Sequence, residues 1–281
     1  MTDLQVLRPR DYKSGVKPIW CPGCGHYSVL NAITKAAAAH SLSRDDTVLV
    51  SGIGCSSRLP AYVDSYGFHG VHGRGLAVAQ GLKLARPELT VIALGGDGDG
   101  FSIGGNHFLH ACRRNVDLTY IAMDNEVYGM TKGQASPTTP VDWSHSKLTP
   151  HGPGVRCFNP AGIALAAGAP WIGRAYSGDP NHMAKLLAEA LAFPGFSFLH
   201  VLSQCITFCP EQVDWKGLVR EREVPAATTA AQAAAVLHDD SGFQIGLLYR
   251  EERPAWEPPR AAAPDTPAVL DALAAAFRVQ P

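Results

Sequence analysis

Two cysteines that share one tight turn are the first residues whose types and spacing could do chemistry. In the segment Trp20-Cys21-Pro22-Gly23-Cys24, the proline fixes one backbone dihedral and the glycine permits the left-handed conformation that bends the chain back. Both sulfurs can therefore face one metal ion, or the pair can act as a redox dithiol.

Two further cysteines follow segments that are expected to be the first and last strands of a sheet. Cys55 follows the earlier strand and Cys205 the later one, and Cys209 is a rival of Cys205 as the fourth ligand. Four thiolates are the number that a structural zinc ion or an iron–sulfur cluster requires. The spacing alone leaves four interpretations open: zinc, a redox dithiol, a cluster, or unrelated buried thiols. We expect Cys112 and Cys157 to be small hydrophobic residues.

A glycine-rich loop at residues 95–100 is the second candidate site. It follows a predicted strand and precedes a predicted helix, so its backbone N–H groups can hold a diphosphate. Asn125 ends the next predicted strand, 28 residues after Asp97, and supplies an amide oxygen beside that carboxylate. Together with the backbone carbonyl of Val127, these oxygens are suitable ligands for Mg²⁺. The alternative is that Asp97 is a helix N-cap and Asn125 a turn residue.

An alternation of short apolar runs and amphipathic segments must position these residues. We expect strands at 47–50, 89–94, 118–123 and 196–202, and helices at 28–40 (with Ser28 as its N-cap), 75–85, 102–113, 160–168, 180–192 and 267–277. This rhythm predicts an α/β fold with a mostly parallel sheet and helices on both faces. Because ligands bind outside the carboxyl ends of parallel strands, the loops should converge on one crevice.

Composition excludes several classes of protein. The 281 residues carry a formal net charge of -1 and show no basic stripe, which argues against binding to nucleic acid. The longest apolar stretch, about residues 163–173, is too short to cross a bilayer, and an odd cysteine count argues against a disulfide framework, so we expect a soluble cytoplasmic protein. We expect an α/β domain at 1–223 that binds both cofactors, and an Ala/Pro-rich arm at 224–281 that wraps a partner or lies on the surface.

Five segments in order resemble a known family. The pattern Gly96-Asp97-Gly98 followed by Asn125 looks like the thiamin diphosphate motif. With the segments at 20–24, 52–57, 72–75 and 124–134, the chain resembles the β subunit of 2-oxoacid:ferredoxin oxidoreductases over roughly residues 12–220. The resemblance implies the thiamin diphosphate-binding fold of the diphosphate-binding type. It also implies a [4Fe–4S] cluster on Cys21, Cys24, Cys55 and Cys205, whereas Cys209 stands where the family segment usually carries Asn.

The resemblance also suggests which residues surround the cofactor. The expected cofactor-binding residues are Gly52, Ile53, Cys55, Ser56, His72, Gly96, Asp97, Gly98, Asp99, Asn125, Val127, Gly129, Met130 and Thr131, with Asp97, Asn125 and Val127 holding Mg²⁺. As catalytic residues, His72 and Arg74 can donate to the diphosphate or the substrate carbonyl, and Lys132 can meet the substrate carboxylate. The alternative for each is a packing or surface role.

The reaction that the family implies is the oxidative decarboxylation of a 2-oxoacid. Coenzyme A accepts the acyl group, and ferredoxin receives two electrons through the cluster. The run at 128–138 looks more like the 2-oxoglutarate enzymes than like the pyruvate enzymes, so we expect 2-oxoglutarate to give succinyl-CoA, with pyruvate or several 2-oxoacids as the alternative and the CO₂-fixing direction left open. The sequence shows no pyrimidine-binding domain, so we expect an α subunit to complete the active site in an αβ dimer of dimers that acts only when assembled.

Two other classes of protein remain as rivals. A non-redox thiamin diphosphate decarboxylase or carboligase would use Asp97 and Asn125 but not the cysteines. A zinc-stabilised binding module would use the cysteines but leave Asp97 and Asn125 without a role. Iron content distinguishes both rivals from a ferredoxin-linked enzyme.

Overall fold

The computed structural model describes residues 7–238, 240–257 and 266–277. Within this part of the chain, eight strands form one sheet in the order β2-β1-β3-β4-β8-β7-β10-β9. Their bounds are β1 Thr47–Ser51, β2 Tyr66–His69, β3 Thr90–Gly96, β4 Leu118–Asp124, β7 Trp171–Tyr176, β8 Phe196–Leu202, β9 Arg220–Glu221 and β10 Gln244–Arg250. Neighbouring strands pair in parallel except β10 and β7, which pair antiparallel. A separate two-stranded hairpin joins β5 (Val127–Tyr128) to β6 (Gln134–Ala135).

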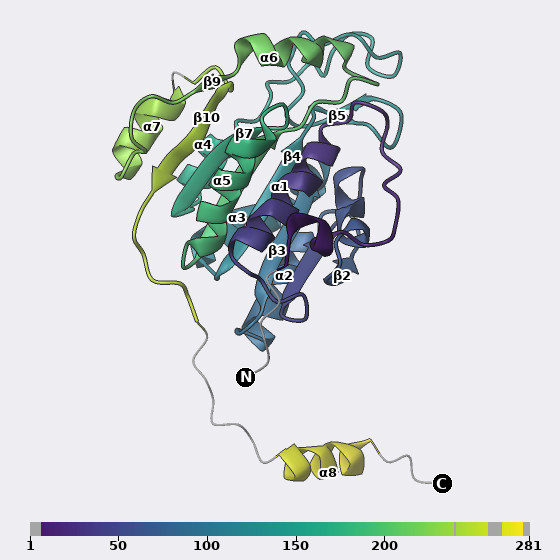
Figure 1. Ribbon diagram of the computed structural model, residues 1–281, viewed down its shortest axis with the longest axis vertical. Helices are drawn as coiled ribbons and strands as arrows, with labels where there is room; N and C mark the ends of the chain where they lie inside the picture. The colour runs from purple at the N-terminus through teal and green to yellow at the C-terminus, as the bar shows by residue number, and fades with distance from the viewer. Residues whose placement is uncertain (1–6, 239, 258–265, 278–281) are drawn as a thin grey trace.

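Helices cover both faces of this sheet, as the sequence predicted. On one face lie α1 (His26–Ala39) and α5 (Pro180–Ala192), which stand in front of the sheet in Figure 1. On the other face lie α2 (Gly75–Ala85), α3 (Gly105–Arg114), α4 (Pro160–Ala166) and α7 (Ala230–His238). The central strands β1, β4, β7 and β8 are buried along their whole length, as expected for parallel strands covered on both faces. The predicted α/β fold is therefore confirmed.

Two predicted helix starts differ from the structure. Helix α1 begins at His26 with Gly25 as its N-cap, so the prediction of Ser28 as N-cap is wrong. The reason is that the N–H of Ser28 already donates to the carbonyl of Gly25, which belongs to the end of the cysteine turn. Helix α3 begins at Gly105 because residues 98–103 form a wider π-helical turn after the glycine-rich loop.

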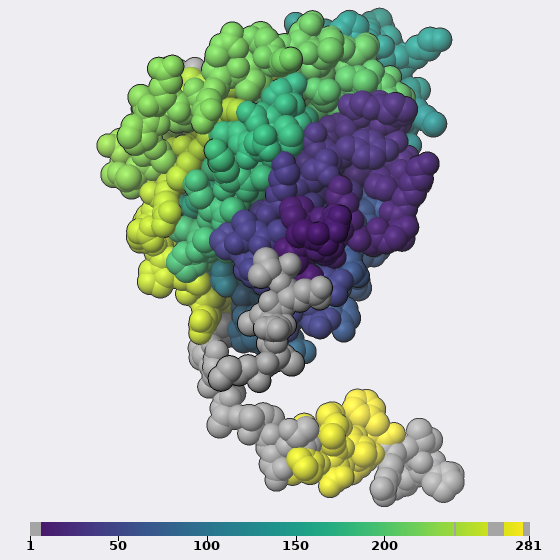
Figure 2. Space-filling model, in the orientation of Figure 1, coloured from purple at the N-terminus to yellow at the C-terminus, as the bar shows by residue number. Residues whose placement is uncertain are grey.

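The expected C-terminal arm from residue 224 is wrong for residues 227–250. Strand β10 pairs with β7, and the buried side chains of Ala233, Leu237 and Leu248 belong to the main core. Small alanine side chains let α7 pack closely, so an Ala-rich composition here marks a core helix instead of a loose segment. The helix expected at 267–277 is confirmed as α8 (Thr266–Ala276), whose Leu270 and Leu273 are exposed (Figure 2). Residues 258–265 of the expected arm lie outside the described residues.

Two shorter helices and several turns complete the description. Helix α6 (Trp215–Leu218) follows a 3₁₀ turn at Pro210–Asp214, and two more 3₁₀ turns lie at Pro9–Tyr12 and Ser56–Tyr62. Among the described helices, none is long and apolar enough to cross a membrane.

Truncation tests where the folded unit ends. A chain that stops after Glu257 should unfold at the same urea concentration as the full chain, because α8 buries little of its surface. A chain that stops after Glu223 should lose more than about 3 kcal/mol, because each large aliphatic side chain buried on α7 and β10 contributes about 1.5–3 kcal/mol. Far-ultraviolet circular dichroism during urea denaturation measures both effects. Equal midpoints for the two truncated chains would show that residues 227–250 are not part of the core.

Candidate functional site

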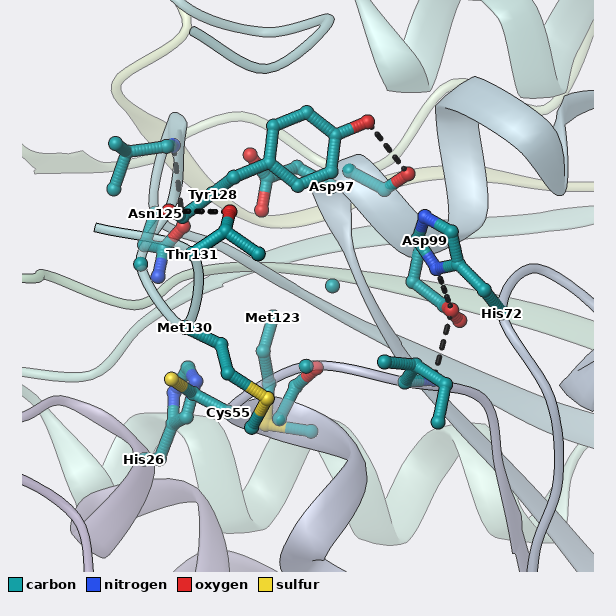
Figure 3. A pocket seen from close by; sticks show the side chains of 17 residues that line it. His26, Cys55, His72, Asp97, Asp99, Met123, Asn125, Tyr128, Met130 and Thr131 are labelled. Carbon is teal, nitrogen blue, oxygen red and sulfur yellow. Dashed lines mark hydrogen bonds and ion pairs between the residues drawn. The ribbon is translucent and has the colours of Figure 1, made fainter. Parts of the chain in front are cut away.

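The carboxyl ends of β1, β3 and β4 open into a cavity of about 230 Å³ (Figure 3). All the predicted cofactor-binding residues except Gly52 line it. His26, Gly54, Met123 and Tyr128 also line it and were not predicted. His26 directly follows the Cys-Pro-Gly-Cys-Gly turn, so its position beside the cysteines was the available signal. The convergence expected from parallel topology is therefore present.

Asp99 ties three of the loops around this cavity together. Its Oδ1 accepts hydrogen bonds from the backbone N–H of Ile53, the backbone N–H of Gly73 and Nδ1 of His72, each at 2.8 Å. Figure 3 shows Asp99 and His72 together on one side of the cavity. Gly52 does not line the cavity, but a Cβ there would stand 2.0 Å from Oδ2 of Asp99. Its role is to let this carboxylate approach the backbone.

Asp97 and Asn125 stand together at the adjoining strand ends. Asp97 is 3% exposed, and its Oδ2 accepts a hydrogen bond from Thr138 at 3.2 Å. Burial, and then the nearby carboxylate of Asp124, raise the pKa of Asp97 well above its usual range. A divalent cation would relieve both effects, so the carboxylate, the Asn125 amide oxygen and the Val127 carbonyl suit Mg²⁺.

Backbone contacts bring the cysteine segments side by side. The N–H of Cys24 donates to the carbonyl of Cys21 at 3.1 Å, which closes the predicted turn. The next residue, Gly25, donates to Gln204 at 3.0 Å, and the indole N–H of Trp20 donates to the carbonyl of Cys55 at 2.7 Å. Three segments that are far apart in the chain therefore meet beside the cavity.

The thiols of these segments affect one another electrostatically. Burial raises the pKa of Cys24 to about 12, with further increases from Cys205, Cys55 and Cys21. Burial also raises the pKa of Cys55, and Cys205 and Cys21 add to it. Clustered thiols with raised pKa values gain most from cationic metal centres, which bind the thiolate form.

Cys209 differs from these four. It is 1% exposed and packs with Val127 and Trp143 in a small apolar cluster. Burial raises its pKa strongly, and of the four candidate ligands only Cys205 adds to the effect. The geometry therefore favours Cys205 over Cys209 as the fourth member of the set.

The spacing of the thiols also bears on the kind of metal centre. Across the described residues, no three His, Cys, Asp or Glu side chains are close enough to hold one metal ion. A zinc ion needs its thiolates around a single centre, whereas a [4Fe–4S] cluster binds each thiolate through a different iron. The wider arrangement suits a cluster better than zinc.

Two of the three expected catalytic residues lie away from the cavity. His72 lines it, but Nη1 of Arg74 donates to Nε2 of His107 at 2.8 Å and Arg74 is not part of the lining. Lys132 is exposed, adopts a positive φ of 84° and is also outside the lining. Neither cation therefore faces the cavity in this chain alone.

Comparisons with known proteins agree on one family. A family model described as "Thiamine pyrophosphate enzyme, C-terminal TPP binding domain" matches residues 52–201. The 2-oxoglutarate oxidoreductase subunit KorB of Mycobacterium tuberculosis is 45% identical over 73% of this chain and 54% of its own length, so the match spans about half of that relative. Subunit KorB of the 2-oxoglutarate synthase of Archaeoglobus fulgidus is 47% identical over 67% of this chain and 70% of its own.

Two further matches extend along nearly the whole chain. The β subunit of 2-oxoacid:ferredoxin oxidoreductase 1 of Aeropyrum pernix is 36% identical over 92% of this chain and 88% of its own length. A solved structure of the 2-oxoglutarate:ferredoxin oxidoreductase of Magnetococcus marinus, with 2-oxoglutarate, coenzyme A and succinyl-CoA bound, is 38% identical. It matches with a TM-score of 0.85 and covers 98% of this chain and 92% of that one.

The raised pKa of Asp97 predicts how metal binding depends on pH. Mg²⁺ must displace a proton from this carboxyl group, so its affinity in the presence of thiamin diphosphate should rise between about pH 7 and about pH 9. The diphosphate is already ionised in that window, since phosphate groups titrate near pH 6. Mg²⁺ titration followed by tryptophan fluorescence measures the affinity. Asp124→Asn removes the neighbouring charge and should move the pH dependence to lower pH, whereas a constant affinity across the window would contradict the assignment.

Proposed function

The chain belongs to the β subunits of 2-oxoacid:ferredoxin oxidoreductases, and from that premise we propose that it carries thiamin diphosphate, Mg²⁺ and a [4Fe–4S] cluster in an enzyme acting on 2-oxoglutarate. The proposed reaction converts 2-oxoglutarate and coenzyme A into succinyl-CoA and CO₂. Two electrons pass to ferredoxin, and the same site serves the reverse, CO₂-fixing direction. When bound, the thiamin cofactor supplies the carbanion chemistry that releases CO₂.

One loop carries this proposal, because it belongs to both candidate cofactor sites. Ile53 and Cys55 line the cavity at the ends of β1, β3 and β4, and Cys55 is also a member of the thiol set. Electrons that leave the cavity therefore have a short route to the cysteines. A non-redox thiamin enzyme would have no use for this arrangement, which argues against that rival.

The chain's own residues can hold the diphosphate end of the cofactor. Asp97, Asn125 and the carbonyl of Val127 would bind Mg²⁺, and the backbone N–H groups of the 95–100 loop would bind the phosphates. His72 donates through Nδ1 to Asp99, which orients its ring at the cavity wall. Gly98 must lack a side chain, since a Cβ would stand 2.2 Å from the ring of Tyr128.

A second cavity supports a dicarboxylate substrate. It measures about 440 Å³ and shares Ile53, Gly54 and Met130 with the first cavity. Its lining includes Lys17, Arg58 and other apolar or neutral residues, with no carboxylate among the described residues that line it. A 2-oxoacid that reacts in the first cavity could therefore place a distal carboxylate near positive charge, which favours 2-oxoglutarate over pyruvate.

The proposal includes a partner α subunit. Thiamin enzymes use a carboxylate to activate the aminopyrimidine ring, but both carboxylates that line the described cavity have other tasks: Asp97 faces the metal site and Asp99 anchors loops. An α subunit would bring the missing glutamate. Exposed apolar side chains near the cavity, Ile53 and Met130, suit such a partner, in an assembly we propose to be an αβ dimer of dimers in the cytoplasm.

Chemical analysis of the assembled enzyme tests this function. A complex with its α subunit, purified without oxygen, should contain about four irons, four sulfides and one thiamin diphosphate per β chain. It should reduce a viologen acceptor when given 2-oxoglutarate and coenzyme A, and more slowly with pyruvate. The β chain alone should be inactive. Zinc in place of iron, or activity of the isolated chain, would refute the proposal.

Single cysteine substitutions test the ligand set. Cys205→Ser should abolish most of the visible absorbance of the cluster and most of the iron, because it removes a ligand. Cys209→Ser should keep the iron, because Cys209 packs in an apolar cluster, and the exposed Cys157→Ser serves as a control. The opposite result for positions 205 and 209 would assign the ligand to Cys209.

A further inference from the structure

Gln212 lies between the two candidate cofactor sites and contacts the backbone of both. Its side chain is 1% exposed and belongs to the 3₁₀ turn at Pro210–Asp214. Oε1 accepts a hydrogen bond from the backbone N–H of Cys205 at 2.7 Å. Nε2 donates to the backbone carbonyl of Asn125 at 2.8 Å. One buried amide therefore joins the loop of the fourth cysteine to the loop of the metal ligand.

A carboxamide is the group that this position requires. Cys205 presents a donor and Asn125 presents an acceptor, so the side chain must accept at one atom and donate at the other. The second hydrogen on Nε2 serves the carboxyl group of Glu126, whose pKa this bond lowers against the stronger raising effects of burial and Asp124. Methionine has nearly the same shape but could make none of these bonds.

The main chain alone does not hold Cys205 in place. The ladder between β4 and β8 ends at Leu202, and one more backbone bond, from Ser203 to the carbonyl of Asp124 at 2.7 Å, continues it. Beyond that point the chain leaves the sheet. The loop then folds back, because Cys209 donates to the carbonyl of Cys205 at 2.8 Å and Gln212 donates to that of Cys209 at 3.0 Å. This fold returns Gln212 to the N–H of Cys205.

We propose that Gln212 is a positioning residue for electron transfer: it holds Cys205 at a set place relative to Asn125 and keeps the Cys205 N–H away from the cysteine sulfurs. The inference rests on the proposed function. It adds to that function the group that aligns the electron-accepting site with the site where the 2-oxoacid reacts.

Two separable effects follow from this role. Without Oε1, the N–H of Cys205 is free to bond a sulfur, and hydrogen bonds to cluster sulfurs make the reduction potential more positive. Without Nε2, the carbonyl of Asn125 loses its partner and the loop that carries the metal ligand loosens. Loss of a buried hydrogen bond of this kind should weaken the affinity for thiamin diphosphate and Mg²⁺ by about tenfold.

The test uses the complex with the α subunit, purified without oxygen, and compares Gln212→Met, Gln212→Glu and a control. The control is Gln80→Met, because Gln80 is also buried, donates to the carbonyl of Leu76 and accepts from Arg114, but lies on α2 away from the cysteines. The measurements are the electron paramagnetic resonance spectrum and reduction potential of the reduced cluster, thiamin diphosphate affinity, and thermal stability. None of these depends on turnover.

Gln212→Met should change the spectrum, make the potential more positive and weaken cofactor binding, with no greater loss of thermal stability than Gln80→Met. Gln212→Glu keeps an acceptor for the Cys205 N–H, so its spectrum and potential should return towards those of the wild type. Spectra and affinities that match the Gln80→Met control would overturn the inference and leave the proposed function intact. A wild-type complex without iron would overturn the proposed function, and the inference with it.

Discussion

The parallel pairing of β1, β3, β4 and β8 is the constraint on which the rest of the structure depends. Parallel strands end at the same edge of a sheet, so the loops that follow them must meet there. The loops after β1, β3 and β4 build the cavity, and the loop after β8 brings Cys205 to it. Asp99 then joins the first of these loops by accepting from Ile53 and Gly73.

The polar groups behind the cavity explain how buried acids are tolerated there. Nε of Arg174 donates to Nδ1 of His200 at 3.3 Å, so the proton of a neutral His200 lies on Nε2, which donates to Asp124 at 2.8 Å. Arg174 also pairs with Asp240 at 2.5 Å, within a part of the protein that solvent barely reaches. Thr138 donates to both Asp124 and Asp97. A negative charge is thus held beneath the position where a cation would bind.

The same edge of the sheet explains why a partner is needed. The described cavity is supplied with groups for a diphosphate, a metal ion and a neighbouring thiol set. Its two carboxylates are committed, and its rim carries the exposed side chains of Ile53 and Met130. A chain built in this way has the phosphate half and the electron-accepting half of an active site, and the aminopyrimidine half must come from another surface.

The sequence by itself determined the central strands, most helices and nearly all of the cavity lining, because each was encoded by local pattern. Apolar runs such as 196–202, the Gly-Asp-Gly turn and the Cys-Pro-Gly-Cys turn are readable without knowing what packs against them. Only tertiary structure decided what depends on distant neighbours. Local pattern made α7 and β10 look like a loose arm until pairing with β7 placed them in the core. It also left Arg74 and Lys132 as candidates until their surroundings showed them outside the cavity. Gln212 had no signal in the sequence, because its role comes from hydrogen bonds to residues 7 and 87 positions away.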